Sequence, residues 1–402
     1  MRILIVWRGI PNPLNPSFAR PYYFIKNYAN KCSMTLLAPN IVLSHAEKYG
    51  EELKGLTDFK EVEVYYPKSM IGKIAKSLIN RLSYTNLTAT KDFNFSKLYF
   101  PELTKAIKRL LKEEKFDVVY LDYMVINHIR EPLEATILEF ISPTLYTQKI
   151  LWKYGTWSIK LPSVLRYFLY RYFESNRYKS FDAGIYVTKT HFELSKPFVP
   201  KKAFIIPPGV DLNYFKPSES QEEEKLVFTG GMGYPVNVIS VLNFCKKIYP
   251  MIKKEIPKVK FYIVGRSPSN EILRLAKLDS SITVTGAVED VRPYVWSSAV
   301  FVVPIVVDDG GIKNKTLEAM AMGKAIVSSP LGAQDIGCEN GKHLIIADNE
   351  KEFAERVVEL IKDEGERRRL GKNARKFVEE NYSWDKKSEE LYRAMLEVIE
   401  GR

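Results

Sequence analysis

The stretch Ala299-Val300-Phe301-Val302-Val303-Pro304-Ile305-Val306 is a nearly continuous apolar run, and the glycine pair Gly310-Gly311 follows it closely. Such a run is typical of a strand that is buried on both faces of a parallel sheet. From about Asn314 the pattern changes to that of a helix, which continues to Gly323. The stretch therefore predicts a strand, a glycine turn and a helix start in an α/β protein.

A helix start of this kind can bind an anion. Its unpaired N–H groups and the positive end of the helix dipole hold a phosphate, and glycine lets the backbone approach closely. Glu318 lies about one turn into the helix, where its carboxylate can accept hydrogen bonds from sugar hydroxyls. A nucleotide-linked sugar offers both groups. The alternative is an ordinary strand-to-helix junction in which Glu318 caps or solvates the helix, and these residues alone leave both interpretations open.

Short apolar runs separated by helix-like segments recur along the chain and predict two doubly wound parallel sheets. An acidic, polar segment at 217–224 has no apolar periodicity and is interpreted as a linker, and the residues from Trp384 onward have the spacing of an amphipathic helix. The runs that predict strands are 2–7, 33–39, 61–67, 116–122, 135–141, 181–188, 201–207, 225–229, 260–264, 281–285, 299–306, 324–328 and 342–347.

Composition indicates a globular protein long enough for two domains, with 402 residues, 46% hydrophobic and 27% charged. Three scattered cysteines favour a reducing compartment, and four scattered histidines give a zinc site little support. The net charge is +12, and most of the excess lies in residues 1–200, which hold 29 basic against 18 acidic residues. This asymmetry suits an anionic partner such as a membrane surface, a lipid phosphate or a nucleic acid, or reflects a solvated lysine-rich surface.

Five segments of the second half, in this order and spacing, resemble those of the family 4 glycosyltransferases, also called glycosyl transferases group 1. Two of the resembling segments are glycine loops, one leads into the second domain, one cradles the nucleotide base, and the last is the helix described above. They are Pro208-Gly209-Val210-Asp211, Phe228-Thr229-Gly230-Gly231-Met232, Val264-Gly265-Arg266-Ser267-Pro268, residues 285–294 and residues 317–327.

The resemblance implies the GT-B fold, in which two Rossmann-like domains face each other across a cleft. We expect an acceptor-side domain at 1–212, a linker at 213–224, a donor-binding domain at 225–384, and a helix at 385–402 that packs back toward the first domain. The family transfers a sugar, here expected to be a hexose, from a nucleotide-diphosphate donor with retention at the anomeric carbon. It requires no obligatory metal or other cofactor.

The sequence departs from the family pattern at two points. The family usually has two glutamates separated by seven residues, and Gly310 stands where the first would precede Glu318. The usual arginine and lysine after the first glycine loop are also absent, so we expect Lys313, Lys315 or Arg266 to supply the positive charge. Gly311 to Lys315 resemble a subgroup of the family that has glycine, asparagine and lysine before this helix.

We assign catalytic roles to Lys315, Arg266, Lys313 and Asp309, and no metal ligand. The pair Asp308-Asp309 is better suited to sugar hydroxyls than to a metal, since Mg²⁺ usually needs more ligands. Glu318→Ala is predicted to lose most donor affinity and Lys315→Ala to lose turnover, with the fold intact. The donor-binding residues are predicted to be Gly230, Gly231, Asn237, Gly265, Arg266, Val288, Val291, Gly310, Gly311, Ile312, Asn314, Lys315, Thr316 and Glu318.

The acceptor side is less defined. Residues 68–82 and 151–181 combine apolar or aromatic side chains with basic ones, which suits an anionic membrane interface, sugar or single-strand stacking, or an internal helix. We expect a cytoplasmic protein attached to the inner face of the membrane that glycosylates a glycan or lipid-linked acceptor, with no nucleic-acid partner. His128 and Glu139 lie near predicted strand ends without an assigned role. The alternatives are a sugar-nucleotide epimerase of the same architecture and a non-catalytic nucleic-acid or carbohydrate-binding protein.

Overall fold

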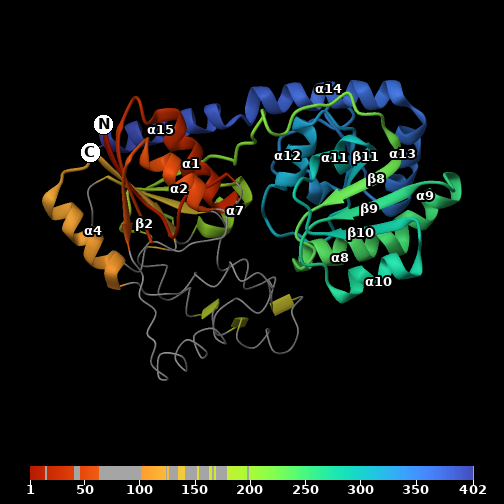
Figure 1. Ribbon diagram of the computed structural model, residues 1–402, viewed down its shortest axis with the longest axis horizontal. Helices are drawn as coiled ribbons and strands as arrows, with labels where there is room; N and C mark the ends of the chain where they lie inside the picture. The colour runs from red at the N-terminus through yellow and green to blue at the C-terminus, as the bar shows by residue number, and fades with distance from the viewer. Residues whose placement is uncertain are drawn as a thin grey trace. The chain divides into compact units, whose positions relative to one another are not determined.

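The structure is a computed structural model, and the chain forms two compact units (Figure 1). The first contains the described residues up to Gly209 together with Trp384 and the residues after it, and the second is Val210–Ser383. The structure describes residues 1–13, 16–39, 46–62, 101–123, 125, 135–140, 152–153, 163–164, 167–168, 179–196 and 199–401.

The first unit is built on a parallel sheet with the order β3-β2-β1-β4-β5-β6-β7. Its strands are β1 (Arg2–Val6), β2 (Ser33–Pro39), β3 (Asp58–Val62), β4 (Val118–Asp122), β5 (Thr136–Phe140), β6 (Ala183–Tyr186) and β7 (Lys202–Ile205). The described helices of this unit are α1 (Pro16–Tyr28), α2 (Ala46–Lys54), α4 (Pro101–Glu113), α7 (Lys189–Ser195) and α15 (Trp384–Glu400).

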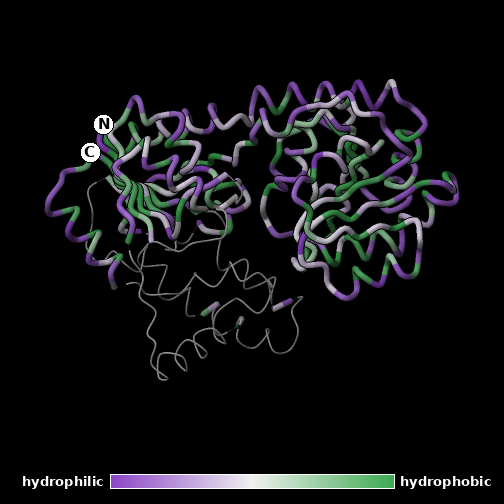
Figure 2. Tube along the Cα trace, in the orientation of Figure 1, coloured by the Kyte–Doolittle hydropathy of each residue, from purple (hydrophilic) through white to green (hydrophobic). Residues whose placement is uncertain are grey.

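Strand β1 shows how this sheet is buried on both faces. Ile3 and Ile5 belong to the cluster that includes apolar residues of α1 and α15, whereas Leu4 and Val6 belong to the cluster that includes those of α4. Successive residues of a strand point to opposite faces, so an uninterrupted apolar run is what a doubly covered strand requires. The strands of both units are coloured mainly as hydrophobic in Figure 2.

Helix α15 packs on α1, although more than 350 residues separate them. Trp384 stacks on Tyr23 with ring centroids 4.8 Å apart, and Tyr392 stacks on Tyr28 at the same distance. The apolar stripe of α15, which the spacing after Trp384 predicts, is buried in the same cluster as the inner face of α1.

The second unit has a parallel sheet with the order β10-β9-β8-β11-β12-β13, which is the strand order of the dinucleotide-binding fold. Helix α12 lies beside α14, and α8 lies beside α10 (Figure 1). The strands are β8 (Glu223–Thr229), β9 (Lys260–Val264), β10 (Ile282–Gly286), β11 (Ser298–Val303), β12 (Ile326–Ser328) and β13 (Ile345–Ile346). The helices are α8 (Pro235–Asn243), α9 (Tyr249–Glu255), α10 (Asn270–Leu278), α11 (Arg292–Trp296), α12 (Asn314–Ala321), α13 (Glu350–Lys362) and α14 (Glu364–Asn381), with a π-helix at Phe244–Ile248 between α8 and α9 and a 3-10 turn at Pro330–Gly332.

Every apolar run that the sequence assigns to a strand contains or overlaps one, so the prediction of two parallel sheets is confirmed. The start of the third run is wrong, because β3 (Asp58–Val62) begins three residues before the predicted run 61–67. Residues 63–67 of that run lie outside the described residues. Because β3 lies at the sheet edge, most of its residues are exposed or only partly buried, and the strand lacks a continuous apolar run that would mark it. Glu223 and Glu224, which the sequence places in the linker, begin β8.

Candidate active site

The candidate site lies where the strand order of the second sheet reverses. β8 and β11 are neighbours, and the chain leaves them toward opposite sides of the sheet. In open α/β sheets the loops beyond the carboxyl ends of two such strands leave a crevice that binds ligands. The loop after β8 carries Gly230 and Gly231, and the loop after β11 carries Gly310 and Gly311 before α12. The predicted helix start at Asn314 is confirmed.

The glycine loops after β8, β9 and β10 are in direct backbone contact. The Gly230 N–H donates to the Val264 carbonyl at 3.0 Å, and the Gly265 N–H donates to the Gly286 carbonyl at 3.2 Å. A Cβ on Gly265 would lie 1.7 Å from the Gly230 carbonyl oxygen, and Gly265 has a φ of +150°. Only glycine fits there, both for space and for conformation.

This packing decides which N–H group of the first glycine loop can bind a ligand. The Gly230 N–H cannot face a phosphate, because the Val264 carbonyl already accepts it. The Gly231 N–H has no partner among the described residues and is the donor that this loop offers.

Lys315 reaches from α12 to the first glycine loop. Its ammonium lies 3.8 Å from the centre of the Phe228 ring and donates to the Asn237 side-chain carbonyl at 2.8 Å. The Asn237 amide in turn donates to the Gly231 carbonyl at 3.0 Å, so Asn237 links the lysine to the loop. A Cβ on Gly230 would lie 2.8 Å from the ammonium. Lys315, rather than Lys313, therefore places its ammonium against the first glycine loop.

Lys313 and Asp309 bind each other instead of facing outward. The Lys313 side chain is buried, and its ammonium donates to Asp309 and, at 2.6 Å, to the Gly311 carbonyl. The Tyr234 hydroxyl donates to the other Asp309 oxygen at 3.3 Å. The ion pair fixes the shape of the loop before α12 and neutralises its charge, so Lys313 contributes position more than net charge.

The first turn of α12 keeps free donors. Its N-cap, Lys313, makes no side-chain capping bond, and the N–H groups of Ile312, Asn314 and Lys315 have no partner among the residues described. The Gly310 N–H donates to Asp308 at 2.8 Å. Thr316 is buried, and its hydroxyl donates to the Gly332 carbonyl at 3.1 Å, so its side chain holds the loop after β12 and does not face the site.

The loop after β10 carries the residues predicted to hold the base. Val288 and Val291 are partly buried against the core of the unit. Asp290, which lies between them in the sequence, accepts hydrogen bonds of 2.8 and 2.9 Å from the Arg292 guanidinium. Arg266, on the loop after β9, is exposed and forms no ion pair in the described part of the chain. It remains available to a ligand but is less fixed than Lys315.

Lys315 and Glu318 have strongly shifted titrations. Burial lowers the pKa of Lys315 to about 7, with a further contribution from the Lys313 charge. Burial likewise raises the pKa of Glu318 to about 7, and the Lys315 charge opposes this shift. No carboxylate among the described residues lies within ion-pair distance of Lys315. Perturbed groups that converge in a crevice are typical of functional sites.

We predict that this pair gives the unliganded protein a local minimum of stability near pH 7. Glu318 has a pKa in the folded protein above its value of 4.5 in the unfolded chain. Its contribution to the stability of the fold is therefore complete below pH 4.5 and is lost as the pH rises through about 7. Lys315 has a folded pKa below its unfolded value of 10.5, so its contribution is complete above pH 10.5 and is lost as the pH falls through about 7.

The measurement is the free energy of unfolding by urea between pH 5 and 9. It compares the wild type with the double variant that carries both Lys315→Met and Glu318→Gln. The difference between the two proteins should be largest near pH 7. A difference that stays constant with pH would contradict the prediction, and the subtraction removes the titration of all other groups.

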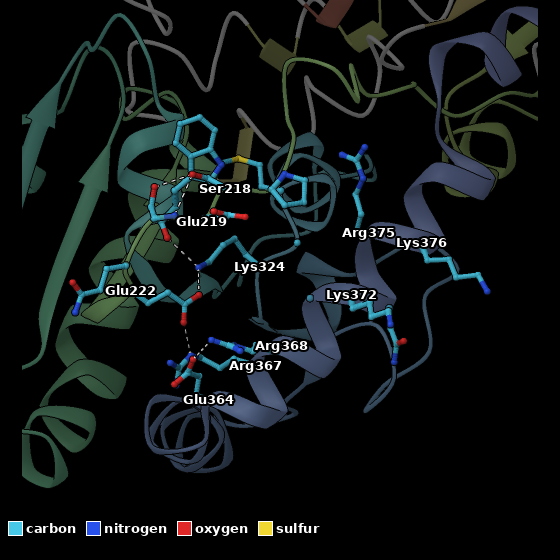
Figure 3. A pocket seen from close by; sticks show the side chains of 18 of the residues that line it. Ser218, Glu219, Glu222, Lys324, Glu364, Arg367, Arg368, Lys372, Arg375 and Lys376 are labelled. Carbon is cyan, nitrogen blue, oxygen red and sulfur yellow. Dashed lines mark hydrogen bonds and ion pairs between the residues drawn. The ribbon is translucent and has the colours of Figure 1, made fainter.

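The cavity drawn in Figure 3 is separate from this site. It has a volume of about 1180 Å³ and contains none of the predicted site residues. Residues 217–222, the turn from Met322 to Lys324 and helix α14 line it, and Glu222 pairs there with both Lys324 and Arg367. Most of its charged side chains thus neutralise one another.

The other residues and segments singled out in the sequence lie in the first half of the chain. Glu139 is buried, accepts from Arg20 and from the Tyr120 hydroxyl, both at 2.7 Å, and has a pKa raised by burial, so it is a structural residue. His128, residues 68–82 and most of 151–181 lie outside the described residues, and the membrane hypothesis built on the two segments stays a prediction.

Within the described ranges, no helix is long and apolar enough to cross a membrane, and no group of three or more His, Cys, Asp or Glu could hold a metal ion.

Comparison with solved structures supports the architecture over the whole chain. Sucrose-phosphate synthase from Thermosynechococcus elongatus aligns with a TM-score of 0.69 at 15% identity and covers 100% of both chains. HepE from Anabaena, in complex with UDP and glucose, aligns with a TM-score of 0.63 at 13% identity, over 98% of this chain and 99% of that one. The predicted GT-B fold is therefore confirmed.

Sequence comparison finds one family model and several relatives that match part of the chain. A protein of Klebsiella pneumoniae described as an uncharacterised 44.6 kDa protein in the cps region is 26% identical over 164 residues, which is 39% of this chain and 42% of that protein. The chain spans less than half of the length of the curated relatives it matches. The model of the family described as glycosyl transferases group 1 matches residues 223–363. This segment, which holds all the predicted site residues, is similar to the glycosyl transferases group 1 family.

Proposed function

We propose that this protein is a retaining glycosyltransferase that moves a sugar, of the hexose class, from a nucleoside-diphosphate donor to a hydroxyl group of a glycan or lipid-linked acceptor. The observation that carries the proposal is the position of the Lys315 ammonium, which Asn237 holds against the first glycine loop at the reversal point of the sheet. The match of residues 223–363 to the model of the glycosyl transferases group 1 family supports it. HepE, which shares the fold, has been crystallised with UDP and glucose.

Different residues of the site act on the diphosphate and on the ribose of the donor. When the glycosidic bond of the donor breaks, negative charge develops on the leaving diphosphate. Lys315, the Gly231 N–H and the free N–H groups at the start of α12 are the donors placed to stabilise that charge. Glu318, one turn further along α12, accepts hydrogen bonds from the ribose hydroxyls.

Asp309 is the group proposed to meet the donor sugar. It lies directly before Gly310, the position at which the family usually has a glutamate, and Lys313 and Tyr234 hold its carboxylate in place. Because it is already paired, we assign it hydroxyl recognition and no proton transfer.

The test is a binding screen of UDP, GDP, ADP, TDP and CDP sugars by calorimetry, repeated with Glu318→Gln. We expect one nucleotide class to bind, and Glu318→Gln to weaken it at least tenfold, since it replaces a carboxylate acceptor by a neutral amide. A folded wild-type protein that binds none of the five would overturn the proposal. Release of an epimerised sugar nucleotide without an acceptor would instead support the epimerase.

A further inference from the structure

Tyr214 lies in the segment that precedes β8 and has no role in the function proposed above. Its side chain is 41% exposed, which is unusual for an aromatic ring fixed by as many contacts as this one has. Asp211 accepts the Tyr214 backbone N–H at 2.9 Å and the Asn213 N–H at 3.0 Å, so the turn that presents the ring is locked locally.

One set of contacts ties this segment to α12. The Arg375 guanidinium donates to the carbonyl of Phe215 at 2.8 Å and to the carbonyl of Ala321 at 2.7 Å. Ala321 is three residues after Glu318, which places it on the next turn of the same helix. The backbone next to Tyr214 is thereby held beside the helix that carries the proposed ribose ligand.

A second set ties Tyr214 to the loop that carries Val288 and Val291. The Arg292 guanidinium lies 3.9 Å from the centre of the Tyr214 ring and donates to the Tyr214 carbonyl at 3.1 Å. The same guanidinium donates two hydrogen bonds to Asp290, which fixes it. A guanidinium over one face of an aromatic ring is an attractive contact that also holds the ring in one orientation.

Electrostatics agree with this placement. Burial, the Asp290 charge and, more weakly, the Glu318 charge raise the pKa of the Tyr214 phenol. The Tyr214 phenol is therefore within electrostatic reach of the Glu318 carboxylate.

We propose that Tyr214 is a binding residue for the nucleoside of the donor, which it contacts through its ring. This inference rests on the proposed function, because it assumes that Glu318 and the loop after β10 hold the nucleotide. Aromatic rings bind the π-face of any base, so Tyr214 strengthens nucleotide binding without selecting one base.

The experiment compares two probes, UDP and inorganic pyrophosphate, in calorimetric titrations of the wild type, Tyr214→Ala and Tyr214→Phe. If the screen favours another nucleoside diphosphate, that one replaces UDP. We expect Tyr214→Ala to weaken UDP about tenfold, the lower part of the range for base–aromatic stacking, and to leave pyrophosphate unchanged. Tyr214→Phe, which keeps the ring, should bind UDP within about twofold of the wild type.

Each alternative result has a separate meaning. Equal UDP affinity in Tyr214→Ala and the wild type would overturn the inference and leave the proposed function intact. An equal loss of affinity for UDP and for pyrophosphate in Tyr214→Ala would also overturn the inference, because it would show a structural role for the ring. Weak UDP binding by Tyr214→Phe would overturn the ring contact. A folded wild type that binds no nucleoside diphosphate would overturn the proposed function itself.

Discussion

Lys315→Met should lower kcat by about a hundredfold or more, which is the loss measured when one preorganised donor to a developing anion is removed. Methionine keeps the length of the side chain and its contact with Phe228 but removes the charge. Because the ammonium is already partly desolvated, the folded protein should gain rather than lose stability at pH 7. A loss of kcat without a loss of stability is the result that separates a catalytic cation from a structural one.

The matched control is Lys372→Met, the same change on the exposed face of α14. Its kcat should equal that of the wild type. The measurement is initial-rate kinetics with the donor that the binding screen identifies, alongside thermal unfolding of both variants. Wild-type kcat in Lys315→Met would remove this residue from the mechanism.

The second large effect is expected from Gly265→Ala. The added methyl would collide with the Gly230 carbonyl oxygen, and alanine rarely adopts the φ of +150° found there. Strained backbone and overpacking each cost about 1–3 kcal/mol, so we expect the free energy of unfolding to fall by about 3 kcal/mol or more. Nucleotide affinity should fall with it, because the displaced carbonyl belongs to the loop that Asn237 and Lys315 contact.

Gly231→Ala is the matched control, one residue along the same loop from Gly230. A Cβ on Gly231 would meet nothing within 4 Å, and its φ is not in the left-handed region. Its stability should change by less than about 0.5 kcal/mol, as for other unstrained surface substitutions. The measurement is the free energy of unfolding of both variants by urea. Equal stability of Gly265→Ala and Gly231→Ala would contradict the steric argument.

The strands and the helix start could be predicted because their signals are local. β11 is apolar from Ala299 to Val303 since both of its faces are covered, and the change to helical spacing at Asn314 is visible in the residues themselves. β3 was misplaced by the same logic, because an edge strand lacks that uniform pattern. The glycine loops were recognised through the family resemblance, and their close backbone contact explains why glycine is required.

The pairing of side chains across the site could not be predicted. The contact of Lys315 with Asn237 joins residues 78 positions apart and depends on the neighbouring arrangement of β8 and β11. From the sequence, three cations could supply the missing charge. Only the geometry shows that Lys313 forms an ion pair with Asp309, whereas Lys315 reaches the first glycine loop. The sequence did not indicate Tyr214 as a binding residue, since Arg292, which lies over its ring, comes from a distant segment.

The packing of α15 on α1 determines the order in which a newly made chain can fold. The second unit is continuous in sequence from Val210 to Ser383 and can assemble as soon as that stretch has left the ribosome. The first unit cannot, because the apolar side chains that α1 presents to Leu391, Met395 and Val398 stay uncovered until the second unit has been synthesised. During that interval the nascent first unit is the part exposed to chaperones and to aggregation, and an expression fragment made for biochemistry should therefore be cut from the second unit.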